Sequence, residues 1–191
     1  DDYDLYMLTL TIPSIESVGS ILDETIRNLN KTFSSLNRKY SQPINGKIAL
    51  KSRYFFMSGG VRVLEITYSD ESGLHPHLHC IICVPKGSII PQRLEKIHEG
   101  KWSTKRKSFN MKSDCDLQLA KCWTMLWYGI DFRKWDSVDF DPKETYLKID
   151  GDFTDYKCLE VDLTELDEGG IFEVFKYTFK SSDVQNYEVF R

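Results

Sequence analysis

Three of the four histidines lie close together, in the segment His75-Pro76-His77-Leu78-His79. In a β-strand successive side chains alternate between the two faces, so His75, His77 and His79 point the same way. Two imidazoles at positions i and i+2 of a rigid strand can bind one divalent cation if a neighbouring strand supplies a third ligand. The pattern predicts a metal site with open coordination positions, which suits catalysis.

Glu65 is the expected third ligand. It stands among apolar neighbours in Val63-Leu64-Glu65-Ile66, where a carboxylate needs a partner or a cation. A hairpin centred near Asp70-Glu71 lays it roughly opposite His75 to His77. His75 is the alternative third ligand, because it shares the face.

A structural zinc site with Cys80 and Cys83 is a competing interpretation of the same strand. In a strand this spacing sends the two sulfurs to opposite faces, which disfavours it. A single strand histidine is more often a hydrogen-bonded structural residue than a ligand. Three on one face beside an internal glutamate favour the metal. The odd number of cysteines, five, favours reduced thiols over a disulfide framework.

A second chemical pattern lies near the C-terminus, where Glu173, Tyr177 and Lys180 are spaced i, i+4 and i+7 and form one polar stripe of a helix. A tyrosine hydroxyl is a poor nucleophile at its usual pKa of about 10. An ammonium group, or a metal that polarises the target, makes attack feasible. Taken alone, the helix is better explained by a surface tyrosine that pairs with Lys and Glu.

The elements that must position these residues alternate between strands and helices. Apolar periodicity predicts strands at 6–12, 61–68, 77–84 and 156–163, with a further candidate at 146–149. It predicts helices from the Ser14 N-cap to Tyr40, around 117–127, and over 166–181. The order indicates an α+β fold in which one mostly antiparallel sheet carries flanking helices. The length of 191 residues fits a single domain spanning 1–191.

The net charge of −4 at first disfavours a nucleic-acid partner, but the charges are segregated. Residues 25–64 contain eight basic side chains and no acidic ones, and residues 86–112 are also net positive, with Lys105-Arg106-Lys107. Residues 131–168 hold thirteen acidic side chains against five basic ones. Basic segments mixed with aromatic residues can follow a phosphate backbone and stack bases. A solvated helix face and a basic loop are the alternative.

Together the patterns resemble the rolling-circle replication initiator (Rep) proteins of the HUH endonuclease superfamily, of the plasmid and phage type with one catalytic tyrosine. Residues 6–13, with Thr9-Leu10-Thr11, resemble the first motif of this family. His77-Leu78-His79 resembles the second motif, and residues 173–183 resemble the tyrosine motif. The resemblance spans about residues 6–183, and the second and third motifs together are specific. It implies a ferredoxin/RRM-like HUH fold with the histidine pair on a central strand.

The resemblance implies metal-dependent nicking and strand transfer of single-stranded or hairpin-extruded origin DNA. By this comparison His77 and His79 bind Mn²⁺ or Mg²⁺, and Tyr177 attacks the phosphorus to give a 5′-phosphotyrosine and a 3′-OH primer. Lys180, and also Lys176, would stabilise developing negative charge, and Glu173 would activate water in termination. Expected DNA-binding residues are Lys176, Lys105, Arg106 and Lys107.

By the same resemblance, a host helicase and polymerase are the expected partners, and the protein could form a homodimer. The absence of a long apolar run or a secretory signal predicts no membrane association and a cytoplasmic location in a bacterium or archaeon. An HUH relaxase or transposase would use the same side chains. From another class, a non-catalytic single-strand-binding or zinc-stabilised module remains open.

Overall fold

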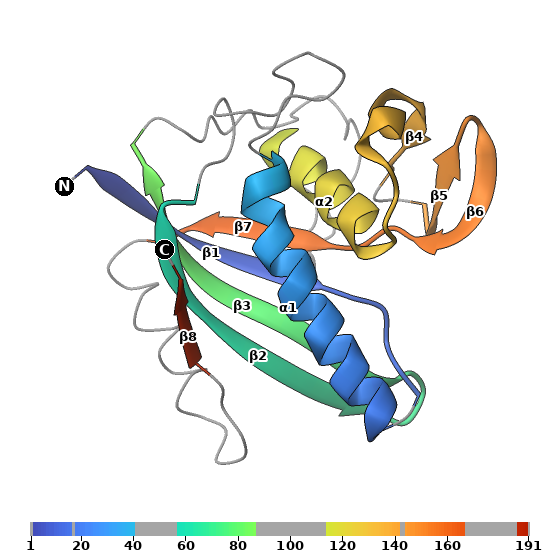
Figure 1. The fold of residues 1–191 in the computed structure, drawn as a ribbon, viewed down its shortest axis with the longest axis horizontal. Coiled ribbons are helices and arrows are strands. Elements are labelled where there is room, and N and C mark those ends of the chain that lie inside the picture. Colours follow the sequence, from blue (N-terminus) through green and yellow to red (C-terminus); the bar gives the residue numbers. More distant parts are fainter. Residues whose placement is uncertain are drawn as a thin grey trace, which may run out of the picture.

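The computed structural model describes residues 2–16, 18–40, 57–86, 114–141, 144–166 and 187–190. Its main sheet contains five strands in the order β7-β1-β3-β2-β8, and every neighbouring pair is antiparallel. Two helices join the strands in the chain order β1, α1, β2, β3, α2, β7 (Figure 1). The bounds are Tyr3–Thr11 for β1, Ser20–Tyr40 for α1, Gly59–Ser69 for β2, Gly73–Pro85 for β3, Asp114–Trp127 for α2, Val161–Glu165 for β7 and Tyr187–Phe190 for β8.

This βαββαβ order with β1 and β3 at the centre is the ferredoxin-like arrangement. The predicted α+β class and antiparallel sheet are therefore confirmed. The predicted strands 6–12, 61–68 and 77–84 are all present, each extended by a few residues. The alternation of apolar and polar residues identified them because one face of each strand is buried.

Both helices pack against the same face of the main sheet (Figure 1). The strand residues that point to this face alternate along β1 and β3, and Leu8, Leu10, Leu78 and Ile82 are at most 1% exposed. Leu29, Phe33 and Leu36 from α1 and Leu119 and Trp123 from α2 complete the cluster. The opposite face of the sheet carries the histidines.

A smaller sheet follows α2 and consists of β4 (Val138–Asp139), β5 (Tyr146–Ile149) and β6 (Asp152–Lys157), preceded by the 3₁₀ helix η1 (Phe132–Ser137). The strand predicted at 146–149 is confirmed. The continuous strand predicted at 156–163 is wrong, because the chain leaves β6 and enters β7 in the main sheet. Leu159, buried between the two strands, donates its backbone N–H to Thr124 Oγ1 at 3.1 Å.

The first helix begins later than the sequence indicates. Ser14 is not its N-cap; Ile15 instead pairs with Leu74, and the helix starts at Ser20 after Gly19 adopts a φ of +84°. Val18 is 73% exposed, although apolar periodicity would place it on the helix face that packs against the sheet. Leu29, Phe33 and Leu36, which continue that periodicity at spacings of four and three, are buried.

The helix predicted over 166–181 and the basic loop predicted over 86–113 fall almost entirely outside the described residues. Among the helices that the structure describes, none is long and apolar enough to cross a membrane.

Candidate metal centre

Strand β3 places its three histidines on the face of the sheet away from the helices. His75, His77 and His79 are half-buried, whereas the alternate residues Leu78 and Cys80 are 1% and 0% exposed. The predicted alternation is therefore confirmed. Cys80 enters the helix-covered core, whereas Cys83, three residues on, belongs to the half-buried set, so the two thiols do not converge on one ion.

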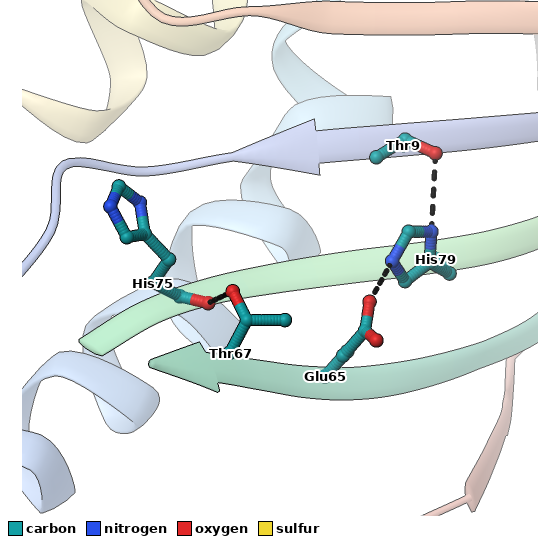
Figure 2. Close-up of polar contacts among 5 residues, drawn as sticks. All are labelled: Thr9, Glu65, Thr67, His75 and His79. Atoms are coloured by element: carbon teal, nitrogen blue, oxygen red, sulfur yellow. Dashed lines mark hydrogen bonds and ion pairs between the residues drawn. The ribbon is translucent and has the colours of Figure 1, made fainter. Parts of the chain in front are cut away.

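Glu65 lies on the neighbouring strand at the position the sequence indicates, because its Cα partner in β3 is His77. The carboxylate does not contact that partner in the described structure. Instead, it accepts a hydrogen bond from Nε2 of His79, with 2.7 Å between Nε2 and Oε2 (Figure 2). The two side chains are 24% and 47% exposed, so the pair is open to solvent and to a ligand.

A threonine contacts the other side of the same imidazole. Thr9 lies directly opposite His79 in the β1–β3 ladder, and its Oγ1 is 3.2 Å from Nδ1 of His79. Figure 2 shows the imidazole between Thr9 on β1 and Glu65 on β2. Thr9 belongs to the Thr9-Leu10-Thr11 segment, but the sequence assigns it no role, because the partner of a strand threonine is known only when the register is known.

His77 lies between the other two histidines on this face, and of the three it forms the fewest hydrogen bonds. Its ring lies 6.2 Å from the His79 ring and 6.1 Å from the His75 ring, centroid to centroid. Within the described part of the chain the His77 ring forms no hydrogen bond. Burial lowers its pKa below the ordinary value of 6.5; His79 and His75 also lower it, and Glu65 opposes them. A neutral imidazole with a free lone pair is the form that binds a metal.

His75, the alternative third ligand, is occupied elsewhere. Its Nε2 is 2.7 Å from Ser14 Oγ and 2.8 Å from Ser72 Oγ, and Ser72 contacts Ser69 in turn. These serines belong to the loop after β1 and to the β2–β3 turn. The contacts give His75 a structural partner set, so the geometry favours Glu65 as the third ligand.

The donor chemistry fits a divalent cation. Two imidazoles and one carboxylate lie on adjacent strands on one face of the sheet, imidazole is a common ligand of divalent metals, and the carboxylate suits Mn²⁺ and similar hard ions. No group of three His, Cys, Asp or Glu side chains is gathered closely enough to hold a metal among the residues that the structure describes. Glu65 and His79 hydrogen-bond to each other instead, so binding requires their side chains and that of His77 to rotate toward a common point.

The other predicted site residues lie outside the described residues. These are Tyr177, Glu173, Lys180 and Lys176 of the tyrosine motif, and Lys105, Arg106 and Lys107 of the basic segment. The described residues therefore include only the histidine–glutamate half of the predicted site.

Comparison with known proteins identified no relative. No protein-family model matches the chain. Neither curated protein sequences nor solved structures gave a significant match.

Proposed function

We propose that the protein is a rolling-circle replication initiator, a metal-dependent endonuclease that nicks single-stranded origin DNA and transfers the strand through a phosphotyrosine. The observation that carries this proposal is the row of His77, His79 and Glu65 on the open face of a ferredoxin-like sheet. On the face of the sheet away from the helices, such a row of half-buried imidazoles and a carboxylate has no role in core packing. It suits the capture of a cation and of the phosphate that the cation binds.

The proposed nucleophile is Tyr177, which the sequence places between β7 and β8. The assignment is supported by the resemblance of residues 173–183 to the tyrosine motif.

In the proposed reaction Tyr177 Oη attacks the scissile phosphorus. The phenol gives up its proton to solvent, the Oη–P bond forms and the bond from phosphorus to the 3′ oxygen breaks. The 3′ oxygen takes up a proton from solvent and becomes the 3′-OH primer. Lys180 and Lys176 stabilise the phenolate or the charge that develops on the phosphate. A bound Mn²⁺ or Mg²⁺ supplies Lewis-acid polarisation of the phosphate oxygens.

Glu173 lies one helical turn before Tyr177 in the predicted helix, at the position where some initiators carry a second tyrosine. A carboxylate there can act as general base toward water and release the product in termination. The protein would then not recycle through a second tyrosyl adduct.

The charge distribution is compatible with a DNA substrate. Four of the acidic residues of 131–168 lie in η1 and the smaller sheet: Asp136, Asp139, Asp152 and Asp155. The proposed DNA contacts are Lys105, Arg106 and Lys107 together with Lys176. A cytoplasmic location, recruitment of a helicase and polymerase, and a homodimer belong to the same proposal.

The alternative of a non-catalytic single-strand-binding sheet is less well supported. RRM-type sheets stack bases on aromatic side chains of their two central strands. Around the site described here, β1 presents Thr9 and Thr11, and β3 presents His77 and His79. The hydroxyls of β1 offer no ring for stacking, and the imidazoles of β3 provide metal ligands and hydrogen bonds as well as rings.

The proposal is tested with a labelled single-stranded oligonucleotide library and Mn²⁺. A covalent protein–DNA adduct that is lost with EDTA and in Tyr177→Phe is the expected result. Tyr187→Phe is the matched control, since Tyr187 lies in β8 with its Cα opposite Val63, one strand removed from His79. Adduct formation that survives Tyr177→Phe but not Tyr187→Phe would move the nucleophile to the edge strand.

The termination role of Glu173 needs a separate assay. Glu173→Ala is expected to leave the first nick intact and to impair release after the second transfer. If the first nick falls as far as it does in Tyr177→Phe, the termination-specific role is wrong.

A further inference from the structure

His79 is hydrogen-bonded through both ring nitrogens, by residues from the two strands that flank it. Glu65 of β2 is 2.7 Å from Nε2, and Thr9 of β1 is 3.2 Å from Nδ1 (Figure 2). Opposing contacts of this kind restrict rotation of the ring about both side-chain torsions. The half-buried His79 side chain, 24% exposed, therefore has a defined orientation with Nε2 toward Glu65.

The chemistry of the partners determines the tautomer. An ionised carboxylate only accepts hydrogen bonds, so Nε2 of His79 carries the proton that it donates to Glu65. In a neutral imidazole the other nitrogen is then an acceptor, and the Thr9 hydroxyl donates to Nδ1. A hydroxyl both donates and accepts, so Thr9 is the one partner in this pair that suits either tautomer.

We propose that Thr9 is a positioning residue for His79, holding Nε2 toward Glu65 and accepting a hydrogen bond from Nδ1–H when Nε2 binds a cation. When a cation replaces the proton on Nε2, that proton leaves to solvent and Nδ1 takes up another, so the imidazole stays neutral. Metal-binding histidines usually donate their second N–H to an outer partner that fixes the ring. The cation half of this inference rests on the proposed function; the orientation of the free ring does not.

Two other threonines on the same face show that this contact is specific. Thr11 Oγ1 donates to the backbone carbonyl of Glu160 at 2.9 Å, and Thr67 Oγ1 to the carbonyl of His75 at 3.5 Å. Both hydroxyls therefore serve the backbone. Thr67 makes a matched control, because Thr67→Val removes a hydroxyl from the same face without touching an imidazole nitrogen. Figure 2 shows Thr67 and its contact with the His75 carbonyl.

The first measurement needs neither metal nor DNA. In ¹⁵N-labelled protein at about pH 8, above the ordinary imidazole pKa of about 6.5, two-bond ¹H–¹⁵N spectra report which ring nitrogen is protonated. We expect protonated Nε2 for His79 in the wild type, with the signals assigned by their loss in His79→Asn. Thr9→Val should shift the His79 nitrogens toward averaged tautomer values, and Thr9→Ser and Thr67→Val should retain the wild-type pattern.

The second measurement is Mn²⁺ affinity, followed by electron paramagnetic resonance. Loss of an outer partner costs about 10- to 100-fold in metal affinity, so Thr9→Val should bind Mn²⁺ that much more weakly, with Thr9→Ser and Thr67→Val near the wild type. An unchanged His79 spectrum in Thr9→Val overturns the positioning role. If the His79 spectrum changes in Thr9→Val but the wild-type protein binds no Mn²⁺, the cation role of Thr9 and the metal dependence of the proposed function are both wrong. The orientation of the free His79 ring by Thr9 then still stands.

Discussion

Nε2 of His79 and Oε2 of Glu65 are 2.7 Å apart, so the two residues proposed to share a cation share a proton when no cation is bound. The contact is diagonal across the β2–β3 ladder, because the direct partner of Glu65 is His77. Glu65 can therefore reach both histidines by side-chain rotation, without any shift of the backbone. A cation that binds here must first replace this hydrogen bond.

Glu65→Gln is expected to weaken Mn²⁺ binding by at least about tenfold, because an amide is a neutral and poorer ligand for a hard cation. Isothermal titration calorimetry gives the affinity. Glu71→Gln is the matched control, since Glu71 is an exposed residue of the turn between β2 and β3. Equal loss of affinity in both variants would indicate a general charge effect and remove Glu65 from the site.

The buried thiols should be chemically inert in the folded protein. Burial raises the pKa of Cys80 to about 12 and that of Cys158 to about 11, and it also raises the pKa of the fully buried Cys122. At about pH 8 a thiol with a pKa of about 12 is thiolate in roughly one molecule in ten thousand, and only the thiolate reacts. Reactivity rises with pH, because each tenfold fall in proton concentration raises the thiolate fraction tenfold until the pKa is reached.

Iodoacetamide labelling followed by peptide mass spectrometry tests this order. Cys80 and Cys122 should remain unmodified until urea unfolds the chain, and half-buried Cys158 should react slowly. Rapid labelling of Cys80 under native conditions would show that the core beneath β3 opens locally.

The sequence predicted the central strands and the face of the histidines correctly because alternation has a period of two and the register of a short hairpin is limited by its turn. Leu78 and Cys80 are buried as expected, and Glu65 does lie opposite His77. The position of β7 beside β1 could not be predicted in this way. That pairing joins residues about 150 apart in the chain, and no local pattern records it.

The roles of Thr9 and Ser14 show the same limit at the level of side chains. Serine is a common N-cap residue, but the hydroxyl of Ser14 bonds to His75, 61 residues away. Gly19, with its positive φ, separates Ser14 from the start of the helix. A short polar side chain bonds to whichever group the tertiary fold brings near, and this choice is not visible in local spacing.

Gly73→Ala should destabilise the fold more than Gly129→Ala. Both glycines have positive φ, +76° and +66°, where a side chain is strained. A Cβ at Gly73 would also lie 2.5 Å from the backbone oxygen of Ile15, whereas a Cβ at Gly129 would meet nothing within 4 Å. We expect a loss of about 1 kcal/mol in unfolding free energy at Gly129 and about 2–3 kcal/mol at Gly73.

Urea unfolding followed by circular dichroism measures both values. The clash at Gly73 involves backbone atoms that form the Ile15–Leu74 bridge, with N–O distances of 2.8 Å in both directions, so it cannot be relieved by a rotamer change. Equal losses in the two variants would mean that the loop after β1 is not held against the hairpin in solution.

His75→Gln separates the structural histidine from the proposed ligands. The His75 ring contacts the hydroxyls of Ser14 and Ser72, which tie the loop after β1 to the β2–β3 turn. Each hydrogen bond of this kind contributes about 1 kcal/mol net to stability. The variant should therefore lose about 1–2 kcal/mol of unfolding free energy, measured by urea unfolding. Its Mn²⁺ affinity should stay within about threefold of the wild type, against a loss of at least about tenfold in His77→Gln. If His75→Gln instead keeps its stability and loses Mn²⁺ affinity as His77→Gln does, His75 replaces Glu65 as the third ligand. The His75 ring would then leave the two serine hydroxyls when the cation binds.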